Sequence, residues 1–321
     1  PAHAILSGLV GSEMCIRDRN RHVAVLMGGW SSEREVSILS GLACAQALKS
    51  SGFQVTKIDV DRNISSVLEK LKPDVCFNAL HGPIGEDGNI QGLLNIMGIP
   101  YTHSGVQASA IAMDKIRTKD ICSKAGLLCP EGASLGRNDI SLLELEKRPF
   151  VIKPKSQGSS IGVNIVYPKD NYISFLEKWS YGEEIVVERF IPGRELTVGV
   201  LNGNALCVTE ITSERGFYDF SAKYESGGSK HIIPADLPDI ITRKALDQAV
   251  LAHKTLGCRG VTRSDFRYDD TQGKLGELYF LEVNTQPGMT STSLIPEQAS
   301  HAGMTFSELL IQLLEAAKCD L

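Results

Sequence analysis

Hydrophobic positions in the first hundred residues alternate between continuous runs and helical spacing. The continuous apolar runs predict buried strands over 22–27, 55–60 and 74–80. Apolar residues three or four positions apart predict intervening helices over 36–50, 64–71 and 89–97. This alternation predicts an α/β fold with a parallel sheet, in which ligands bind beyond the carboxyl ends of the strands.

After residue 105 the pattern changes to α+β. Helical spacing predicts helices over 114–124, 239–256 and 305–317. Short apolar runs separated by turn residues predict strands over 150–153, 163–166, 184–190, 196–201, 205–211, 261–268 and 277–283. These strands are expected to form antiparallel sheets. Residues 213–231 form a long polar loop with aromatic side chains, which is typical of a functional lid or of a disordered segment.

Composition narrows the class of protein. The chain has 321 residues, of which 42% are apolar and 22% charged, as in an ordinary globular protein of two or three domains. The net charge of −5 argues against a general nucleic-acid partner. No apolar run is long enough to span a membrane, so no membrane partner is expected.

Two further features concern the ends and the compartment of the chain. Residues 1–20 show no sustained period, and we interpret them as a disordered tail or as a cloning or sequence-assembly scar. The eight cysteines are scattered, without a C-x-x-C pair, and several lie in apolar surroundings. Buried reduced thiols of this kind predict a cytoplasmic protein.

The segment from Lys153 to Gly162 has the composition of a phosphate-binding loop. Its small residues let backbone N–H groups approach an anion, and Lys153 supplies positive charge. The terminal G-K-[ST] of a Walker A loop is missing, so a plain hairpin turn is the alternative. Gly28-Gly29 likewise falls short of a dinucleotide fingerprint, which argues against a dehydrogenase.

Two short segments place oxygen ligands on neighbouring strands. Arg263 and Asp265 are two positions apart, as are Glu282 and Asn284, so each pair shares one face of its strand. A hairpin that pairs Phe266 with Leu281 sets Asp265 opposite Glu282. Two carboxylates and an amide oxygen suit Mg²⁺, which completes its shell with phosphate and water. The alternative is a solvated cluster of charges.

Three further residues have both a structural and a functional interpretation. Ser32 and Glu35 have the spacing of a capping box, which places Glu33 in the first turn of a helix. Glu33 either stabilises the helix dipole there or binds a ligand. His81 follows a strand in a glycine-rich loop. It is either a residue of a functional site or part of a plain turn. Lys115 binds an anion or is a solvated helix charge.

The order and spacing of these segments resemble the D-alanine–D-alanine ligases of the ATP-grasp superfamily. The resemblance runs from residue 22 to the C-terminus and rests on GGWSSEREVS (28–37), LHGPIGEDGNIQG (80–92), MDKIRTK (113–119), KPKSQGSSIGV (153–163), VERFIPGRELTVGVL (187–201), YDFSAKY (218–224), TRSDF (262–266) and LEVNTQPGMTSTSLIPE (281–297). It implies an N-terminal α/β substrate domain (21–104), a central ATP-grasp domain (105–191) and a C-terminal ATP-grasp domain (192–321) with a lid loop at 213–231.

The resemblance also implies a role for each matching residue. ATP would be held by Lys115, Lys153, Ser159, Ser160, Glu188, Glu195 and Lys223, under a loop that includes Gly158. Two Mg²⁺ ions, or Mn²⁺, would be bound by Asp265, Glu282 and Asn284. Glu33 and His81 would lie at the first D-alanine, and Ser293 and Leu294 at the carboxylate of the second. Arg263 and the Gly288 N–H would stabilise the oxyanion, and the Tyr224 hydroxyl would join Ser159 and Glu33 in a catalytic hydrogen-bond network.

The implied reaction joins two D-alanine molecules through an acyl phosphate, for peptidoglycan precursor synthesis. No residue of the sequence is an obvious base for the attacking amine. The alternatives are a related ligase that uses D-lactate or D-serine, and a catalytically inactive binding module. An inactive module is expected to have lost a magnesium ligand or Arg263, and this chain keeps them all. The resemblance further implies a homodimer through the N-terminal domain.

Overall fold

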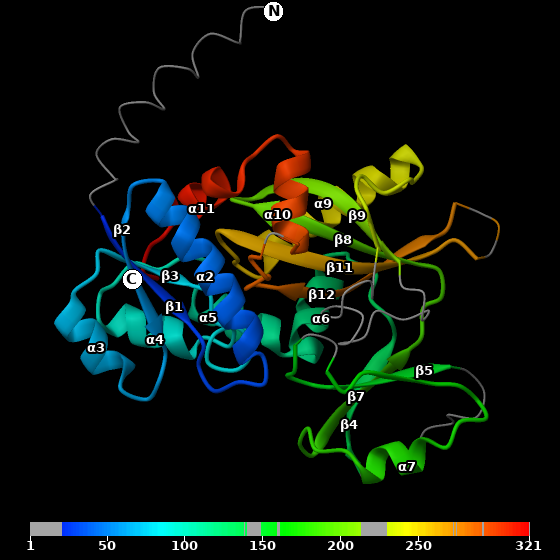
Figure 1. Ribbon diagram of the computed structural model, residues 1–321. Coiled ribbons are helices and arrows are strands. Elements are labelled where there is room, and N and C mark those ends of the chain that lie inside the picture. The colour runs from blue at the N-terminus through cyan, green and yellow to red at the C-terminus, as the bar shows by residue number, and fades with distance from the viewer. Residues whose placement is uncertain are drawn as a thin grey trace, which may run out of the picture.

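The chain folds around three β-sheets in a computed structural model (Figure 1). The structure describes residues 21–137, 139, 149–158, 161–212, 230–271, 273, 275–290 and 292–320. A three-stranded sheet has the order β2-β1-β3, a four-stranded sheet the order β4-β7-β5-β6, and a five-stranded sheet the order β10-β9-β8-β11-β12. In Figure 1 the four-stranded sheet lies below the five-stranded one, and the three-stranded sheet lies beside them.

The N-terminal part is the predicted parallel α/β unit. Its strands are β1 (His22–Met27), β2 (Gln54–Asp59) and β3 (Val75–Asn78), and its helices are α2 (Arg34–Ser50), α3 (Ile64–Leu71) and α4 (Asn89–Ile96). Both neighbours of β1 run parallel to it. Because β1 is covered on both faces, nearly all its side chains are buried, which explains its continuous apolar sequence.

The middle of the chain forms two helices and the four-stranded antiparallel sheet. The elements are α5 (Val106–Met113), α6 (Lys115–Lys124), β4 (Gly132–Gly136), β5 (Phe150–Pro154), β6 (Asn164–Val166), α7 (Tyr172–Glu177) and β7 (Glu184–Arg189). The sequence pattern did not predict α5, β4 or α7. Asp114 begins α6 by accepting hydrogen bonds from the backbone N–H groups of Ile116 and Arg117.

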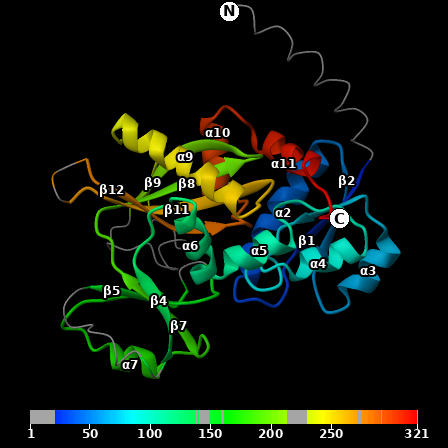
Figure 2. The same cartoon turned by 180° about the vertical axis from the view of Figure 1, so that it is seen from behind.

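The last part forms the five-stranded antiparallel sheet and its covering helices. Its elements are β8 (Arg194–Leu201), β9 (Asn204–Thr212), β10 (Lys230–Ile232), α9 (Asp239–Thr255), β11 (Val261–Asp269), β12 (Glu277–Asn284), α10 (Leu294–His301) and α11 (Phe306–Glu315). Figure 2 shows α9 across one face of this sheet. On the other face Gln298 of α10 accepts from the Gly199 N–H at 2.7 Å, and a Cβ on Gly199 would collide with that side chain.

The end of the predicted lid loop is wrong by two residues. Lys230 and His231 belong to β10, where they pair with Thr212 and Ile211 of β9. Three residues are too short a strand to show a period in sequence, so the pattern does not reveal it. Residues 213–229 of the predicted loop lie outside the described residues.

The parallel sheet is joined to the rest of the chain through a shared interior. One buried apolar cluster contains residues of β1, α2, β3, β11, α10 and α11. A buried polar link runs beside it, where Asn78 Nδ2 donates to Gln286 Oε1 at 3.2 Å and Gln286 Nε2 donates to the Asn78 carbonyl at 2.5 Å. The carboxyl end of β3 is therefore fixed against the segment that follows β12.

Two expectations from composition are met in the described part of the chain. Cys76 and Cys207 are buried, and all seven cysteines described are free thiols. None of the helices described there is both long and apolar enough to cross a membrane.

Candidate active site

Two adjoining cavities lie where the three sheets meet. The larger has a volume of about 490 Å³ and is lined by the N-terminal unit, β11, β12 and the start of α10. The smaller, about 90 Å³, lies between the four-stranded and five-stranded sheets. Lys115, Gln157 and Glu282 line both cavities, so a molecule in one can meet a molecule in the other.

Most residues singled out in the sequence line one of these cavities. The larger is lined by Glu33, His81, Lys115, Gly158, Arg263, Glu282, Asn284, Gly288, Ser293 and Leu294. The smaller is lined by Lys115, Lys153, Glu188, Glu195, Asp265 and Glu282. Ser159, Ser160, Lys223 and Tyr224 lie outside the described residues. Among the described candidates, residues far apart in sequence are therefore brought to one place.

The hairpin of β11 and β12 places Asp265 opposite Glu282, as predicted. The register inferred for the next pair is wrong, because a bulge follows Asp265 and sets Phe266 opposite Phe280 instead of Leu281. The bulge lets both phenylalanine rings enter the core, where they meet edge to face at 5.8 Å. Leu281 is left to line the smaller cavity.

Cations hold the two carboxylates of this hairpin. Arg263 Nε and a terminal guanidinium nitrogen donate to the two oxygens of Asp265 at 2.9 and 2.7 Å, and Thr197 Oγ1 donates to Asp265 at 2.7 Å. Lys115 Nζ lies 3.4 Å from Glu282 Oε2. The two carboxylates are thus neutralised from the sides, while their opposed positions leave a shared strip of oxygen ligands.

This strip fits a hard divalent cation. Its donors are two carboxylates and the amide of Asn284, and Mg²⁺ is typically held by one or two carboxylates plus phosphate oxygens. In the described part of the chain no three His, Cys, Asp or Glu side chains cluster as a complete metal cage. The donor set therefore matches a metal that arrives with a phosphate ligand better than a closed structural site.

A buried cluster of two lysines and one glutamate lies beside the smaller cavity, which Lys153 and Glu188 line. Lys119 of α6 and Lys153 of β5 both pair with Glu188 of β7. Burial lowers the pKa of Lys119 to about 8 and lowers that of Lys153 well below its usual range. With two lysines and a single carboxylate, the cluster favours an anionic ligand.

Lys119, which pairs with the cavity residue Glu188, was missed by the sequence analysis. It lies four residues after Lys115 in α6, which puts the two on one face of the helix. That spacing is the signal in the sequence, but the partner Glu188 is 69 positions away. Only the packing of α6 against the four-stranded sheet brings them together.

Glu33 directly precedes α2, which begins at Arg34, and its side chain makes no capping hydrogen bond to the helix. The predicted capping box at Ser32 is therefore wrong; Ser31 Oγ instead accepts from the Glu33 N–H at 3.2 Å and donates to the His81 carbonyl. Glu33 is buried against the backbone of Gly82 and Gly158, where added Cβ atoms would lie 2.8 and 3.3 Å from its Oε2.

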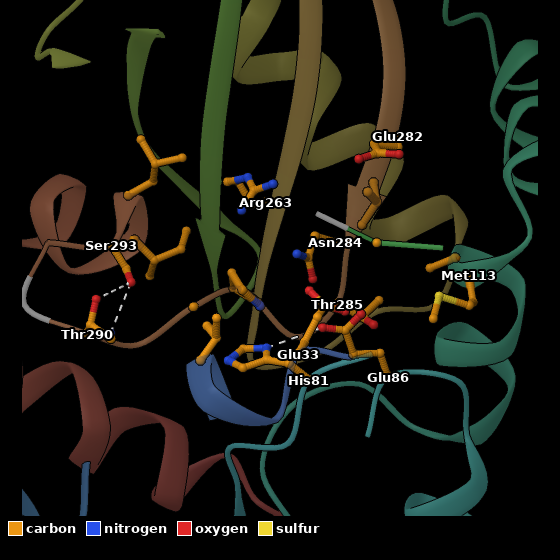
Figure 3. Close-up of a pocket in the computed structure, with 18 of the residues that line it drawn as sticks. Glu33, His81, Glu86, Met113, Arg263, Glu282, Asn284, Thr285, Thr290 and Ser293 are labelled. Atoms are coloured by element: carbon orange, nitrogen blue, oxygen red, sulfur yellow. Dashed lines mark hydrogen bonds and ion pairs between the residues drawn. The ribbon is translucent and has the colours of Figure 1, made fainter. Parts of the chain in front are cut away.

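His81 is held by two polar neighbours at the floor of the larger cavity. Its Nδ1 lies 3.3 Å from Glu86 Oε1 and its Nε2 lies 3.2 Å from Ser40 Oγ. Figure 3 shows Glu33, His81 and Glu86 grouped on one side of the cavity, with Arg263 and Glu282 on the strands across from them. Glu86, a second residue missed in the sequence, stands in the glycine-rich loop that pointed to His81.

The start of α10 forms another wall of the larger cavity. Ser293 precedes the helix, and its hydroxyl contacts Thr290 Oγ1 at 2.7 Å and the Thr290 N–H at 3.0 Å (Figure 3). A Cβ on Gly288 would lie 3.0 Å from Ser293 Oγ, so glycine lets the backbone approach this hydroxyl. Exposed backbone N–H groups and the helix dipole favour an anion at such a helix start.

The fold and these cavities define an ATP-grasp protein: a parallel α/β unit followed by two antiparallel sheets that enclose a lysine- and carboxylate-lined cavity. The family model for the D-ala D-ala ligase C-terminus matches residues 136–315, and that for the N-terminus matches residues 63–104. The chain belongs to the D-alanine–D-alanine ligase family.

Similar proteins cover nearly the whole chain. A D-alanine–D-alanine ligase of Methylorubrum populi is 54% identical over 305 residues, 94% of this chain and 99% of the relative. One of Agrobacterium fabrum is 52% identical over 303 residues, 93% of this chain and 98% of the relative.

Solved structures agree with these sequence matches. The D-alanine–D-alanine ligase of Bacillus anthracis complexed with ATP is 33% identical and has a TM-score of 0.80. The match covers 92% of this chain and 97% of that protein. The VanG D-Ala:D-Ser ligase of Enterococcus faecalis is 30% identical and has a TM-score of 0.78. The match covers 92% of this chain and 99% of that protein.

Proposed function

We propose that this chain is an ATP-dependent D-alanine–D-alanine ligase that forms D-alanyl-D-alanine for peptidoglycan precursors. The observation that carries the proposal is the pair of cavities with a common wall. ATP occupies the cavity between the sheets, and the two D-alanine molecules occupy the larger one. The transferred phosphoryl group then passes beside Lys115 and Glu282, which line both.

The first step converts a poor acyl donor into a reactive one. The carboxylate of the first D-alanine attacks the γ-phosphorus of ATP, which gives an acyl phosphate and ADP. Lys115 and Lys153, which line the smaller cavity, offset the negative charge of the phosphates. Mg²⁺ held by Asp265, Glu282 and Asn284 would neutralise charge on the phosphoryl group during transfer.

The second step forms the peptide bond. The amine of the second D-alanine attacks the acyl carbon, and inorganic phosphate leaves. Arg263 and the Gly288 N–H line the cavity where the tetrahedral oxyanion forms. Preorganised donors of this kind each contribute on the order of 10²–10³ in rate.

Positions of the substrates follow from the charges of the cavity walls. The buried carboxylate of Glu33, beside His81, binds the ammonium of the first D-alanine. The Leu294 N–H and the Ser293 hydroxyl bind the carboxylate of the second. The two amino acids thus lie between opposite ends of the cavity, with their reacting groups near Arg263.

Related ligases that use D-serine or D-lactate are the alternative function. The D-Ala:D-Ser ligase of E. faecalis has the same fold, so the fold does not decide the second substrate. The proposal for D-alanine is supported by the identity above 50% to D-alanine–D-alanine ligases. The decisive experiment is phosphate release from ATP with D-alanine, compared with L-alanine, D-lactate and D-serine and combined with product analysis. Release that needs D-serine or D-lactate, or no release at all, overturns the proposal.

The proposal includes a homodimeric, cytosolic enzyme whose three domains have the boundaries expected from the sequence. The exposed side chains Leu39 and Leu42 on α2 support an interface on the N-terminal unit. The free thiols support a reducing compartment. Light scattering of the purified chain tests the dimer.

A further inference from the structure

His231 is a residue of the larger cavity for which the proposed reaction has no role. It lies on β10 and lines the same cavity as Ser293 and Leu294. Its Nδ1 is 2.6 Å from Glu297 Oε2. Its Nε2 is buried and has no hydrogen-bond partner among the residues that the structure describes. A buried polar nitrogen without a partner is unfavourable, so a ligand that supplies one is stabilised there.

The ring of His231 is oriented by two elements, α10 and β9. A carboxylate accepts hydrogen bonds, so the Nδ1–H of His231 donates to Glu297 on α10. Glu297 lies in the first turn of α10, where its N–H donates to the Ser293 carbonyl at 3.1 Å. On the opposite side Ile211 of β9, the register partner of His231, packs with Leu294. The ring is therefore held next to the start of α10.

The charges near this ring favour a bound anion. Glu297 is the carboxylate that contacts the ring, and the cationic Arg263 lines the same cavity. The acid on the adjacent strand, Glu210, pairs with Arg194. The helix start at Ser293 adds partial positive charge.

We propose that His231 is a recognition residue for the second D-alanine, and that its Nε2–H donates to the carboxylate of that substrate. The proposal rests on the proposed function, which places this carboxylate at Ser293 and Leu294. With the substrate bound, the ring stands between two carboxylates, that of Glu297 and that of D-alanine, and bridges them. Glu297 is then a positioning residue that orients the ring.

The test compares four variants in steady-state kinetics. His231→Phe removes the donor, His231→Gln keeps an amide donor near the same place, and Glu297→Gln weakens the orientation of the ring. His301→Phe, on an exposed position of the same helix, is the matched control. All four are first compared with the wild type by thermal melting, and His231→Gln and Glu297→Gln carry the test if the phenylalanine variant does not fold.

We expect His231→Phe to raise KM for the second D-alanine about 10- to 100-fold, the usual range for a lost hydrogen bond to a charged group. The turnover number, KM for ATP and acyl-phosphate formation, followed by positional isotope exchange in ATP, remain within twofold of wild type. His231→Gln recovers part of the loss, and His301→Phe behaves as wild type.

Two results overturn the proposal for His231 alone. One is an unchanged KM for the second D-alanine in His231→Phe. The other is a large fall in turnover number that added imidazole restores, because that pattern identifies a proton acceptor for the amine. A wild-type chain that makes no D-alanyl-D-alanine overturns the proposed function itself, so the two failures are distinguished.

Discussion

Replacement of Glu188 by glutamine tests the electrostatic wall of the smaller cavity. In the wild type this carboxylate is 4% exposed and pairs with both Lys119 and Lys153, which are also buried. Glu188→Gln keeps the size of the side chain and removes its charge. Two ammonium groups then lie in the interior without the carboxylate that pairs with both of them, and the free energy of unfolding falls.

The size of the loss follows from two bounds. Removing one partner of a buried ion pair typically costs about 3–5 kcal/mol. The variant escapes part of this cost by releasing the proton of a lysine. For Lys119, whose pKa burial lowers to about 8, neutralisation at pH 7 costs about 1 kcal/mol. Since Lys153 also has to be accommodated, we expect a total loss of about 2–4 kcal/mol at pH 7.

The loss decreases as pH rises. The folded pKa of Lys119 lies below its unfolded value of 10.5, so the folded state sheds this proton first and gains stability relative to the unfolded state between about pH 8 and 10.5. Above pH 8 Glu188 has one charged lysine fewer to neutralise. The difference in unfolding free energy between wild type and Glu188→Gln is therefore smaller at pH 9 than at pH 7.

Urea unfolding at pH 7 and pH 9 measures this difference. The matched control is Glu184→Gln on the same strand, where an exposed carboxylate pairs with Lys155. An exposed pair contributes little, so the control should lose less than about 1 kcal/mol at either pH. A Glu188→Gln variant as stable as the control, or one equally destabilised at both pH values, refutes the electrostatic argument.

Three further predictions concern the proposed reaction. Asp265→Asn and Glu282→Gln should each abolish most phosphate release at saturating Mg²⁺ while the protein stays folded, because they remove the charge of a metal ligand; near-normal turnover excludes them as metal ligands. Glu33→Gln should raise KM for the first D-alanine strongly and change stability by less than about 1 kcal/mol, since the side chain caps nothing; a shifted melting curve with normal kinetics contradicts this. Tyr224→Phe should weaken dipeptide synthesis by about 0.5–1.5 kcal/mol and permit detectable D-alanyl-D-lactate, because it removes the hydroxyl expected to join Ser159 and Glu33; product analysis at acidic, neutral and mildly basic pH checks both.

The elements with a strong local signal were predictable from sequence. β1 is buried on both faces, so its apolar run identified it, and the pairing of Asp265 with Glu282 followed from strand alternation. Gly288 and Ser293 became candidates through a family resemblance, because a glycine beside a serine has no chemical signature by itself.

The features that the sequence did not predict depend on tertiary contacts. The bulge after Asp265 lets Phe266 and Phe280 both pack in the core. The hydrophobic pattern of either strand alone does not predict it. Lys119 of α6 became a candidate only because it pairs with Glu188 of β7, which is distant in sequence. His231 lies on a three-residue edge strand that exists because β9 provides its hydrogen bonds. Each is decided by what packs nearby.

The polar link between Asn78 and Gln286 has a consequence for synthesis of the chain. These residues are 208 positions apart, and the link fixes the parallel sheet against the segment that leads to Gly288 and Ser293. During translation the N-terminal unit emerges long before the strands that complete the cavities. A chain that ends before β12 therefore lacks Glu282, one of the three residues that line both cavities. We expect such an intermediate to transfer no phosphoryl group, because Glu282 and Asn284 are among the last residues of the site to be made.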